Sequence, residues 1–312
     1  MRLRWATTIL STPLVTALSN DAGGEWSPVA DMMTGRSDPG VAALNGTVYA
    51  VGGNSGGSST TTLKSTEAFD VASGTWGAIA DMSTARDGPG VAVLDGSIYA
   101  VCGTDDHGVK LQSGERYDLV TGRWTAIAAM RAGRTQMGAA ALNGTLYVVG
   151  GYDGFYIKNV ESYNPRTDTW AAAPDMLEAR SQAGVATLGG MLYAAGGSRG
   201  AAHLKSAERF DPVTQRWSAI ADMPTARAHL ALAGVDGALY AIGGSDTIGN
   251  LGTVDRYDPD TDSWSAAAGM TKARSALGAA ALGDKIYAVG GWDGHAHLKS
   301  AEEFSQQMLE HL

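Results

Sequence analysis

The sequence predicts an all-β protein, a six-bladed β-propeller with four antiparallel strands in each blade. One motif recurs six times along the 312 residues, at intervals of 46 to 50 residues, and a period of this length is typical of propeller blades. Each copy contains two short apolar segments joined by a two-residue turn, the pattern of a β-hairpin. No stretch of ten or more residues in the repeats has the apolar spacing and capping residues of a helix.

Each copy of the motif keeps four residue types at fixed places. A Trp precedes a Met by six residues, the Met precedes an Arg by four, and a Tyr then lies three residues before a Gly pair, or before Cys102-Gly103 in the second copy. The tryptophans are Trp26, Trp76, Trp124, Trp170, Trp217 and Trp264. The arginines are Arg36, Arg86, Arg134, Arg180, Arg227 and Arg274.

The third copy shows why one unit forms four strands. Met137–Leu142 and Thr145–Val149 flank Asn143-Gly144, and Asn-Gly is a strong hairpin signal because both turn residues need a positive φ. Lys158–Tyr163 follows the Gly pair as a third strand, and Thr169–Ala173, which carries the Trp, is the fourth. The other copies place Asn-Gly, Asp-Gly, Gly-Gly or Gly-Asp at the same turn.

The order of the strands predicts how the ring closes. Glu25–Ala30 is a Trp-bearing strand with no partners before it, and Ser300–Phe304 is a third strand with no Trp strand after it. We therefore expect the N-terminal strand to complete the sixth blade, which leaves no open sheet edge there. The expected organisation is an N-terminal segment (1–23), the propeller (24–304) and a C-terminal tail (305–312).

These residues resemble the kelch repeat over nearly the whole chain. The combination of Arg, Tyr-x-x-Gly-Gly, Glu-x-(Tyr/Phe)-Asp and Trp-x5-Met is specific to that family, whose four strands form one blade. The second copy departs from it, because Cys102 replaces the first Gly of the pair. Cys102 is the only cysteine, so an intramolecular disulfide is excluded. We interpret it as a small residue tolerated at a packing position.

Composition and charge exclude several partners. There are 23 Lys and Arg against 32 Asp and Glu, a net charge of −9, which disfavours nucleic acid because binding to phosphates needs clustered cations. The chain also lacks the basic amphipathic helices of membrane-surface proteins. We expect a monomer that binds neither nucleic acid nor a membrane interior.

The first 23 residues leave the location of the protein open. Arg2 and Arg4 precede an apolar stretch, Trp5–Leu18, and Val15-Thr16-Ala17 offers a small-residue cleavage site, as in a secretory signal. Several Thr and Ser residues weaken that stretch, which is also too short and polar to span a bilayer. A cytoplasmic location is slightly favoured over export.

The repeat also predicts which face carries function. The Arg at the start of each first strand and the loop after each Gly pair lie at the same end of the hairpin, because the first strand leaves that end and the second returns to it. These loops differ most between copies, and variable loops on a rigid scaffold commonly carry binding residues. They are residues 54–63, 104–110, 152–157, 198–203, 245–250 and 292–297.

Five of the six histidines fall on this face. They are His107, His203, His229, His295 and His297. Two interpretations remain open: a polar site with titratable groups, or loops that collect polar residues. Asp105-Asp106-His107 and His295-x-His297 are the best metal candidates, but neither has a recognised ligand spacing, so no metal and no cofactor are predicted.

The six arginines also have two interpretations. The kelch resemblance implies that they line a pocket for acidic peptides, together with the residue after the Gly pair, which is Tyr152 or Trp292 in two copies. Alternatively, each Arg pairs with an acid that recurs in the third strand and belongs to the scaffold. These acids are Glu67, Glu115, Glu161, Glu208, Asp255 and Glu302.

Differences between the copies narrow the candidate site. Aromatic residues occur in the third loop, Tyr152, Phe155 and Tyr156, and in the sixth, Trp292, and aromatics beside Arg are common in interface hot spots. The candidate ligand- or partner-binding residues are Arg36, Arg86, Arg134, Arg180, Arg227, Arg274, Tyr152, Phe155, Tyr156, His203, His229, Trp292, His295 and His297. The residues two positions after each Arg are Asp38, Gly88, Gln136, Gln182, His229 and Ala276, whose polar members suit a sugar or a peptide carboxylate.

Two functions follow from this reasoning. The first is a binding scaffold that presents the loop-bearing face to a protein, a peptide or an anionic ligand. The alternative is a carbohydrate-active or sugar-binding propeller, similar to the bacterial kelch protein that equilibrates sialic acid anomers. The chain contains no nucleophile motif or phosphate loop, so a non-enzymatic role is favoured and an enzymatic one stays open.

Overall fold

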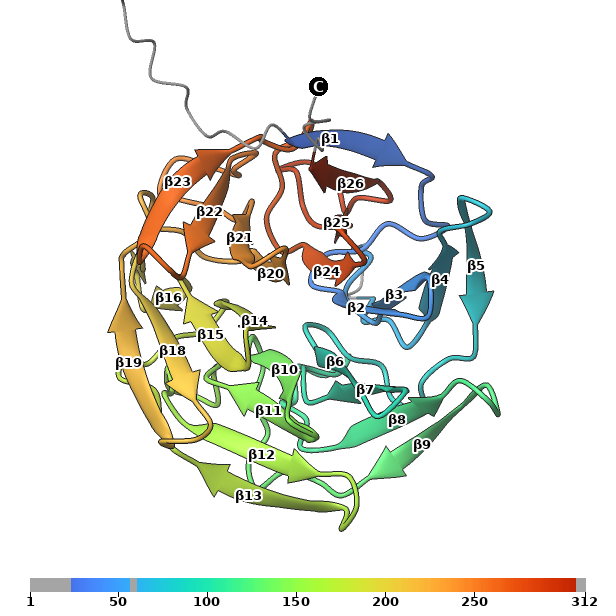
Figure 1. Ribbon diagram of the computed structural model, residues 1–312. Coiled ribbons are helices and arrows are strands. Elements are labelled where there is room, and N and C mark those ends of the chain that lie inside the picture. Colours follow the sequence, from blue (N-terminus) through green and yellow to red (C-terminus); the bar gives the residue numbers. More distant parts are fainter. Residues whose placement is uncertain (1–23, 57–60, 307–312) are drawn as a thin grey trace, which may run out of the picture.

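The protein is a six-bladed β-propeller, as predicted. The computed structural model describes residues 24–56 and 61–306, in which six four-stranded antiparallel sheets surround a central axis (Figure 1). The first strand of each blade lies innermost and the Trp-bearing fourth strand lies outermost (Figure 1). The described residues contain no helix, and therefore none that could cross a membrane.

The first three blades have the same strand order, from the axis outward. Blade 1 consists of β2 (Gly40–Leu44), β3 (Thr47–Val51), β4 (Thr66–Asp70) and β5 (Thr75–Ile79). Blade 2 consists of β6 (Gly90–Leu94), β7 (Ser97–Val101), β8 (Gly114–Asp118) and β9 (Arg123–Ile127). Blade 3 consists of β10 (Gly138–Leu142), β11 (Thr145–Val149), β12 (Val160–Asn164) and β13 (Thr169–Ala173).

The last three blades repeat that order, with a small additional hairpin in one loop. Blade 4 consists of β14 (Gly184–Leu188), β15 (Met191–Ala195), β18 (Ala207–Asp211) and β19 (Arg216–Ile220). Its loop contains β16 (Ser198–Arg199) and β17 (Ala202–His203). Blade 5 consists of β20 (Ala231–Val235), β21 (Ala238–Ile242), β22 (Val254–Asp258) and β23 (Ser263–Ala267). Blade 6 consists of β24 (Gly278–Leu282), β25 (Lys285–Val289), β26 (Ala301–Gln306) and β1 (Gly24–Val29).

The predicted hairpin of the third copy is present. Leu142 pairs with Thr145 across Asn143-Gly144, and the turn residues have φ of 50° and 73°. The third strand begins at Val160 rather than at Lys158, two residues later than predicted. The reason is that the carbonyl of Asn159 accepts from Arg134, and that of Lys158 accepts from the backbone N–H of Met176.

The N-terminal strand closes the ring. β1 pairs with β26 from Gly24↔Gln306 to Val29↔Ala301, which makes it the outer strand of blade 6 (Figure 1). Trp26 packs on Phe304 with ring centroids 5.3 Å apart. β26 extends to Gln306, while the segment 1–23 and residues 307–312 of the expected tail lie outside the described residues.

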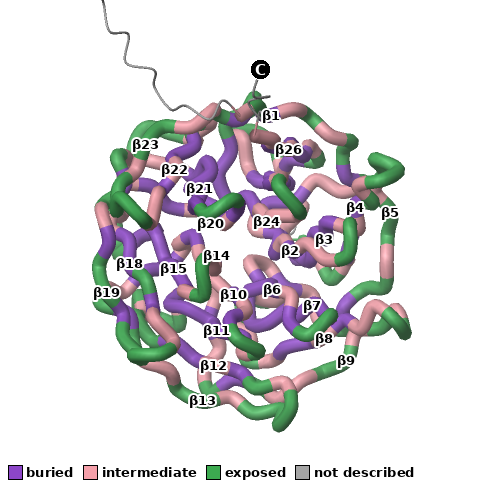
Figure 2. The backbone as a smooth tube through the Cα atoms, in the orientation of Figure 1, coloured by how far each residue is buried: buried purple, intermediate pink, exposed green. Residues whose placement is uncertain are grey.

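The core lies between adjacent blades, where aromatic rings meet. In blade 3, Tyr163 contacts Trp170 on its own fourth strand and Tyr99 on the second strand of blade 2. Figure 2 shows the second and third strands mostly buried and the outer strands alternating between exposed and intermediate. Trp26 and Trp217 are buried, and the other four repeat tryptophans are partly exposed.

Each repeat Trp also hydrogen-bonds to the preceding blade. The indole N–H of Trp170 donates to the carbonyl of Ala128, at 2.8 Å, and the other five repeat tryptophans make the equivalent bond. These bonds connect the outer strands of neighbouring blades, and at two of these junctions the backbone N–H of Ala128 and of Ala221 also donates to Asp168 and Asp262.

Replacing Trp170 with Phe tests this connection. The variant keeps an aromatic ring but loses the indole N–H, and we expect the free energy of unfolding to fall by about 1–2 kcal/mol from the lost hydrogen bond and the smaller ring. Urea denaturation of both proteins measures the difference. A Trp170→Phe variant as stable as the wild type would show that this bond does not hold the blades together.

Candidate functional site

The face that carries the variable loops is defined by pairing close to the axis. The residue after each Arg forms a backbone bridge with the first residue after the Gly pair of the same blade, for example Thr135 with Tyr152 and Ser275 with Trp292. The six Arg-to-first-strand segments and the six loops therefore share one face, here called the loop face. The opposite face carries the hairpin turns and the turns between third and fourth strands.

The six repeat arginines are buried in the scaffold. The Arg274 side chain is 0% exposed, and its guanidinium donates to the carbonyls of Gly290 and Ser300, both at 2.9 Å, and to the Glu302 carboxylate at 2.7 Å. The other blades repeat this arrangement with the pairs Arg36–Glu67, Arg86–Glu115, Arg134–Glu161, Arg180–Glu208 and Arg227–Asp255.

Five of the six acids, all except Asp255, also accept a backbone N–H of the described residues on the same face. The other oxygen of Glu302 accepts the backbone N–H of Thr271 at 2.7 Å, and Glu208 accepts that of Leu177 at 2.6 Å. The ion pair thus fixes the segment between the fourth strand of one blade and the first strand of the next. Burial lowers the pKa of the Arg274 guanidinium, and the neighbouring Glu302 charge partly offsets this.

These contacts correct the expectation that the repeat arginines contact a ligand. Arg36, Arg86, Arg134, Arg180, Arg227 and Arg274 are at most 3% exposed. Their Nη1 and Nη2 atoms donate to strand carbonyls and carboxylates, because leaving such a charge unpaired inside the protein would be costly. Their Nε atoms are buried and have no hydrogen-bond partner among the described residues. The six arginines belong to the scaffold, as the alternative interpretation held.

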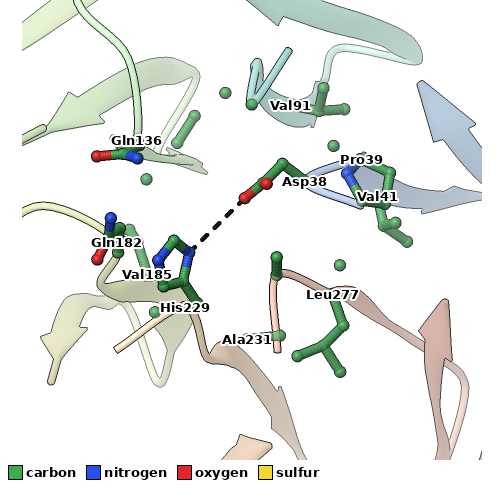
Figure 3. Close-up of a pocket in the computed structure, with 18 of the residues that line it drawn as sticks. Asp38, Pro39, Val41, Val91, Gln136, Gln182, Val185, His229, Ala231 and Leu277 are labelled. Carbon is green, nitrogen blue, oxygen red and sulfur yellow. Dashed lines mark ion pairs between the residues drawn. The ribbon is translucent and has the colours of Figure 1, made fainter. Parts of the chain in front are cut away.

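The candidate site is the mouth of the central channel on the loop face. A cavity of about 180 Å³ lies there, between the six segments that enter the first strands (Figure 3). The residues two positions after each Arg line it, and they are Asp38, Gly88, Gln136, Gln182, His229 and Ala276. Of the binding residues predicted from the sequence, only His229 lines this cavity. The other five positions two residues after an Arg were noted in the sequence but were not included among the predicted binding residues.

A nearly closed ring of five backbone hydrogen bonds, open between Gly88 and Gln136, links these six residues. The N–H of His229 donates to the carbonyl of Gln182 at 2.9 Å, and the N–H of Ala276 donates to that of His229 at 2.9 Å. The same bond joins Gln182 to Gln136, Asp38 to Ala276, and Gly88 to Asp38. All six residues have a positive φ, between 50° and 60°, a conformation that favours glycine.

The side chains at the mouth converge on the cavity. The Asp38 carboxylate and the His229 imidazole point toward each other across the mouth, with Nδ1 and Oδ1 3.9 Å apart (Figure 3). Gln182 lies next to the imidazole, and Gln136 lies on the far side of Gln182 from it (Figure 3). The Ser198 hydroxyl donates to Gln182 Oε1 at 3.0 Å, which orients that carboxamide.

A second carboxylate, Asp87, lies beside the mouth. Its Oδ2 accepts from Asn54 at 3.4 Å, whereas Oδ1 is buried and has no hydrogen-bond partner among the described residues. Burial and the nearby charge of Asp38 raise the pKa of Asp87 to about 6. Sequence reasoning missed this residue, although the other copies carry Ser, Thr or Ala at its position.

Replacing Asp87 with Ser, the residue at this position in three other blades, tests whether the buried carboxylate destabilises the protein. A carboxyl with a raised pKa keeps its proton longer in the folded than in the unfolded state, so stability falls as pH rises from about 4 through about 6. We expect the Asp87→Ser variant to exceed the wild type by roughly 1–3 kcal/mol at pH 8 and to match it near pH 4. Urea denaturation at both pH values measures this, and an equal gain at both would contradict it.

The remaining predicted residues lie on the loop face, outside the mouth cavity. Trp292 is partly buried and meets the His297 ring edge-on at 4.9 Å, and His297 Nδ1 lies 3.0 Å from the Ser37 hydroxyl of the next blade. The Tyr152 and Tyr156 rings are 5.3 Å apart. His203 is partly buried and His295 is exposed. The described residues contain no group of three His, Cys, Asp or Glu residues suited to a metal ion.

Exposed apolar side chains are concentrated around this face. Phe155 is 79% exposed and Ile248 is 93% exposed, both at loop tips. Met33, Val109, Tyr156 and Leu177 are the other large apolar residues exposed in its loops and connecting segments. Among the described residues, only Val120 and Val213 are comparable on the opposite face. Six of the eight large apolar residues that are exposed among the described residues therefore lie on the loop face.

Comparisons with known proteins agree with the architecture. A family model described as the KLHDC2/KLHL20/DRC7 Kelch-repeats domain matches residues 129–291, and the Kelch motif matches residues 35–83 and 85–131. A solved structure titled "Structure of YjhT" is similar with a TM-score of 0.74 and 16% identity, over 86% of this chain and 94% of that one. At this identity the likeness shows the fold alone. No curated protein sequence gives a significant match.

Proposed function

We propose that this protein, which belongs to the kelch-repeat family of β-propellers, is a binding scaffold whose loop face receives a protein or peptide. One polar side chain of the partner enters the channel mouth, and the loop tips contact the surface around it. The observation that carries this proposal is the set of polar side chains held at the mouth in a strained backbone conformation.

The positive φ occurs at this position in all six blades, including Gly88 and Ala276, so it belongs to the scaffold, whereas the polar side chains do not. Gln136 and Gln182 both have φ of 57°, and His229 has φ of 53°, and a non-glycine residue held there costs on the order of 1 kcal/mol or more. Blade 2 has Gly88 at the equivalent position and joins the same ring of backbone bonds. Glycine would therefore serve the fold as well in the other blades, and polar side chains kept despite strain are typical of functional sites.

The size of the cavity sets what enters it. A cavity of about 180 Å³ is close to the roughly 150 Å³ that holds a benzene molecule, and below the roughly 300–1,000 Å³ of pockets that enclose a whole ligand. The mouth itself therefore takes one side chain or one ring, and the channel continues from it into a second cavity of about 190 Å³, which shares Val41 and Val91 with the first. The rest of the partner lies on the loop tips, where Phe155 and Ile248 offer apolar contacts.

The buried arginines change the expected ligand. The preference for an anionic ligand depended on guanidinium groups at the mouth, and those groups are paired with the third-strand acids. The side chains that line the mouth instead offer a carboxylate, which accepts hydrogen bonds, and carboxamides and an imidazole, which both accept and donate them. A sugar is the second candidate, because the same atoms suit hydroxyl groups and Trp292 lies on the same face.

Replacing Gln136 and Gln182 with Gly separates binding from folding. Glycine removes the cost of the positive φ in the folded state, but it also raises the conformational entropy of the unfolded chain. Because these effects oppose each other, we expect the free energy of unfolding of the double variant to stay within about 1 kcal/mol of the wild type. Peptides selected from a displayed library on the wild-type protein should bind the double variant at least about tenfold more weakly than the wild type, since both glutamine side chains contact the inserted group.

Gln215→Gly is the matched control. Gln215 has the same residue type and a φ of 55°, but it lies in a turn on the opposite face, so its replacement should leave binding unchanged. Selected peptides that bind the double variant as well as the wild type would contradict the proposal. If no peptide is selected and monosaccharides bind the wild type but not the double variant, the sugar-binding function holds instead.

A further inference from the structure

Building on the proposed binding role of the mouth, we infer that the group it takes from a partner is a cation, an ammonium or a guanidinium, bound by the Asp38 carboxylate. This names the chemical class of the ligand and reverses the anionic preference that the repeat arginines had suggested. Four features of the described residues support it.

The first feature is the set of charges at the mouth. Among the residues that line the cavity, Asp38 and His229 are the only ones with ionisable side chains, and none is Lys or Arg. His229 supplies a positive charge only when it is protonated. The six repeat arginines lie close by, but each is neutralised by its own acid. The mouth therefore holds a carboxylate without a permanent counter-charge.

The second feature is that Asp38 is open to a ligand. Its side chain is 34% exposed and accepts no hydrogen bond within the described part of the chain, and its Oδ1 lies 3.9 Å from His229 Nδ1. Its neighbours in the ring are Gly88 and Ala276, whose lack of long side chains leaves space on both sides of the carboxylate. A donor group therefore has access to the carboxylate oxygens.

The third feature is a second acid behind the first. Asp87 lies near enough for the charge of Asp38 to disfavour its ionisation, and its buried Oδ1 has no hydrogen-bond partner among the described residues. A cation at Asp38 would reduce the repulsion between the two carboxylates. Binding of a cation is therefore favoured additionally, because it weakens the repulsion between Asp38 and Asp87 that is present in the free protein.

The fourth feature is the supply of neutral acceptors. Gln136 and Gln182 each place a carboxamide at the cavity, and a carbonyl oxygen retains a second lone pair even where, as in Gln182, it already accepts from Ser198. A guanidinium has five N–H donors and an ammonium three, so a carboxylate with two carboxamides meets their needs. The net charge of −9 also attracts a cationic partner from a distance.

A pair of peptides that differ only in charge tests this inference. Acetyl-Gly-Arg-Gly-amide and its citrulline counterpart have nearly the same shape, but citrulline is neutral. We expect the wild-type protein, titrated by NMR, to bind the arginine peptide at least about tenfold more tightly, as for hydrogen bonds to a charged group. Asp38→Asn should abolish this preference, and it should fold, because Asn tolerates the left-handed backbone of this position.

Asp246→Asn is the control for charge. It removes one negative charge from the same face, at the tip of a loop. Asp246 Oδ1 accepts the backbone N–H groups of Ile248 and Gly249, and an Asn oxygen can accept them too, so the loop should keep its shape. This variant should still prefer the arginine peptide. Equal binding of the two peptides, no binding of either, or a preference that survives Asp38→Asn would overturn the inference. Library-selected peptides that need Gln136 and Gln182 but carry no cation would overturn it while leaving the proposed function in place.

Discussion

Deleting residues 1–31 is expected to unfold the propeller. The truncation removes β1 and its six-residue pairing with β26, the contact of Trp26 with Phe304, and the indole hydrogen bond from Trp26 to the carbonyl of Ala268. Loss of a buried Trp alone costs about 3–5 kcal/mol. With the lost strand pairing, the total approaches the roughly 5–15 kcal/mol that stabilises a whole domain.

Circular dichroism and size-exclusion chromatography measure this result. We expect the truncated chain to lose its cooperative thermal transition and to associate, because β26 becomes an exposed sheet edge. A chain that lacks only residues 1–22 keeps β1 and isolates its contribution. If the two truncated proteins melt at the same temperature, β1 does not close the ring in the way described.

Replacing Arg274 with Met is expected to lower the free energy of unfolding by about 3–5 kcal/mol, because Glu302 is left buried without its counter-charge. The same change removes donors from the carbonyls of Gly290 and Ser300. In the double variant Arg274→Met, Glu302→Leu, part of the loss should be recovered, since no unpaired charge remains.

Arg166→Met is the control for this substitution. Arg166 is exposed in a turn on the opposite face, and its replacement should change stability by less than about 0.5 kcal/mol. Urea denaturation of all four proteins gives the comparison. An Arg274→Met variant as stable as the control would mean that the repeat arginines do not hold the scaffold, and it would return them to the list of residues free to bind a ligand.

The sequence was sufficient to predict the fold because the repeat encodes it locally. The turn at Asn143-Gly144 and the unpartnered Trp strand near the N-terminus led to the hairpin and to the closure seen in the structure. The start of β12 at Val160 was not predictable in the same way. It depends on carbonyls that bond to Arg134 and Met176, which lie in other parts of the chain.

The candidate site was only partly predictable for a related reason. Repetition placed the arginines and loops on one face, but an Arg and an acid that recur once per blade are consistent with both a scaffold pair and a ligand pocket. Only the buried contact, such as that of Arg274 with Glu302, decides between them. Asp87 was missed because its neighbours Asp38 and Asn54 come from another blade.

We propose that a partner binds at the channel mouth on the loop face. Hydrogen–deuterium exchange, with and without a peptide selected on the wild-type protein, tests it most directly. We predict protection of the segments around Asp38, Gln136, Gln182 and His229 and of the loops beside them. Protection confined to the opposite face, at turns such as Asn143-Gly144, would contradict the claim.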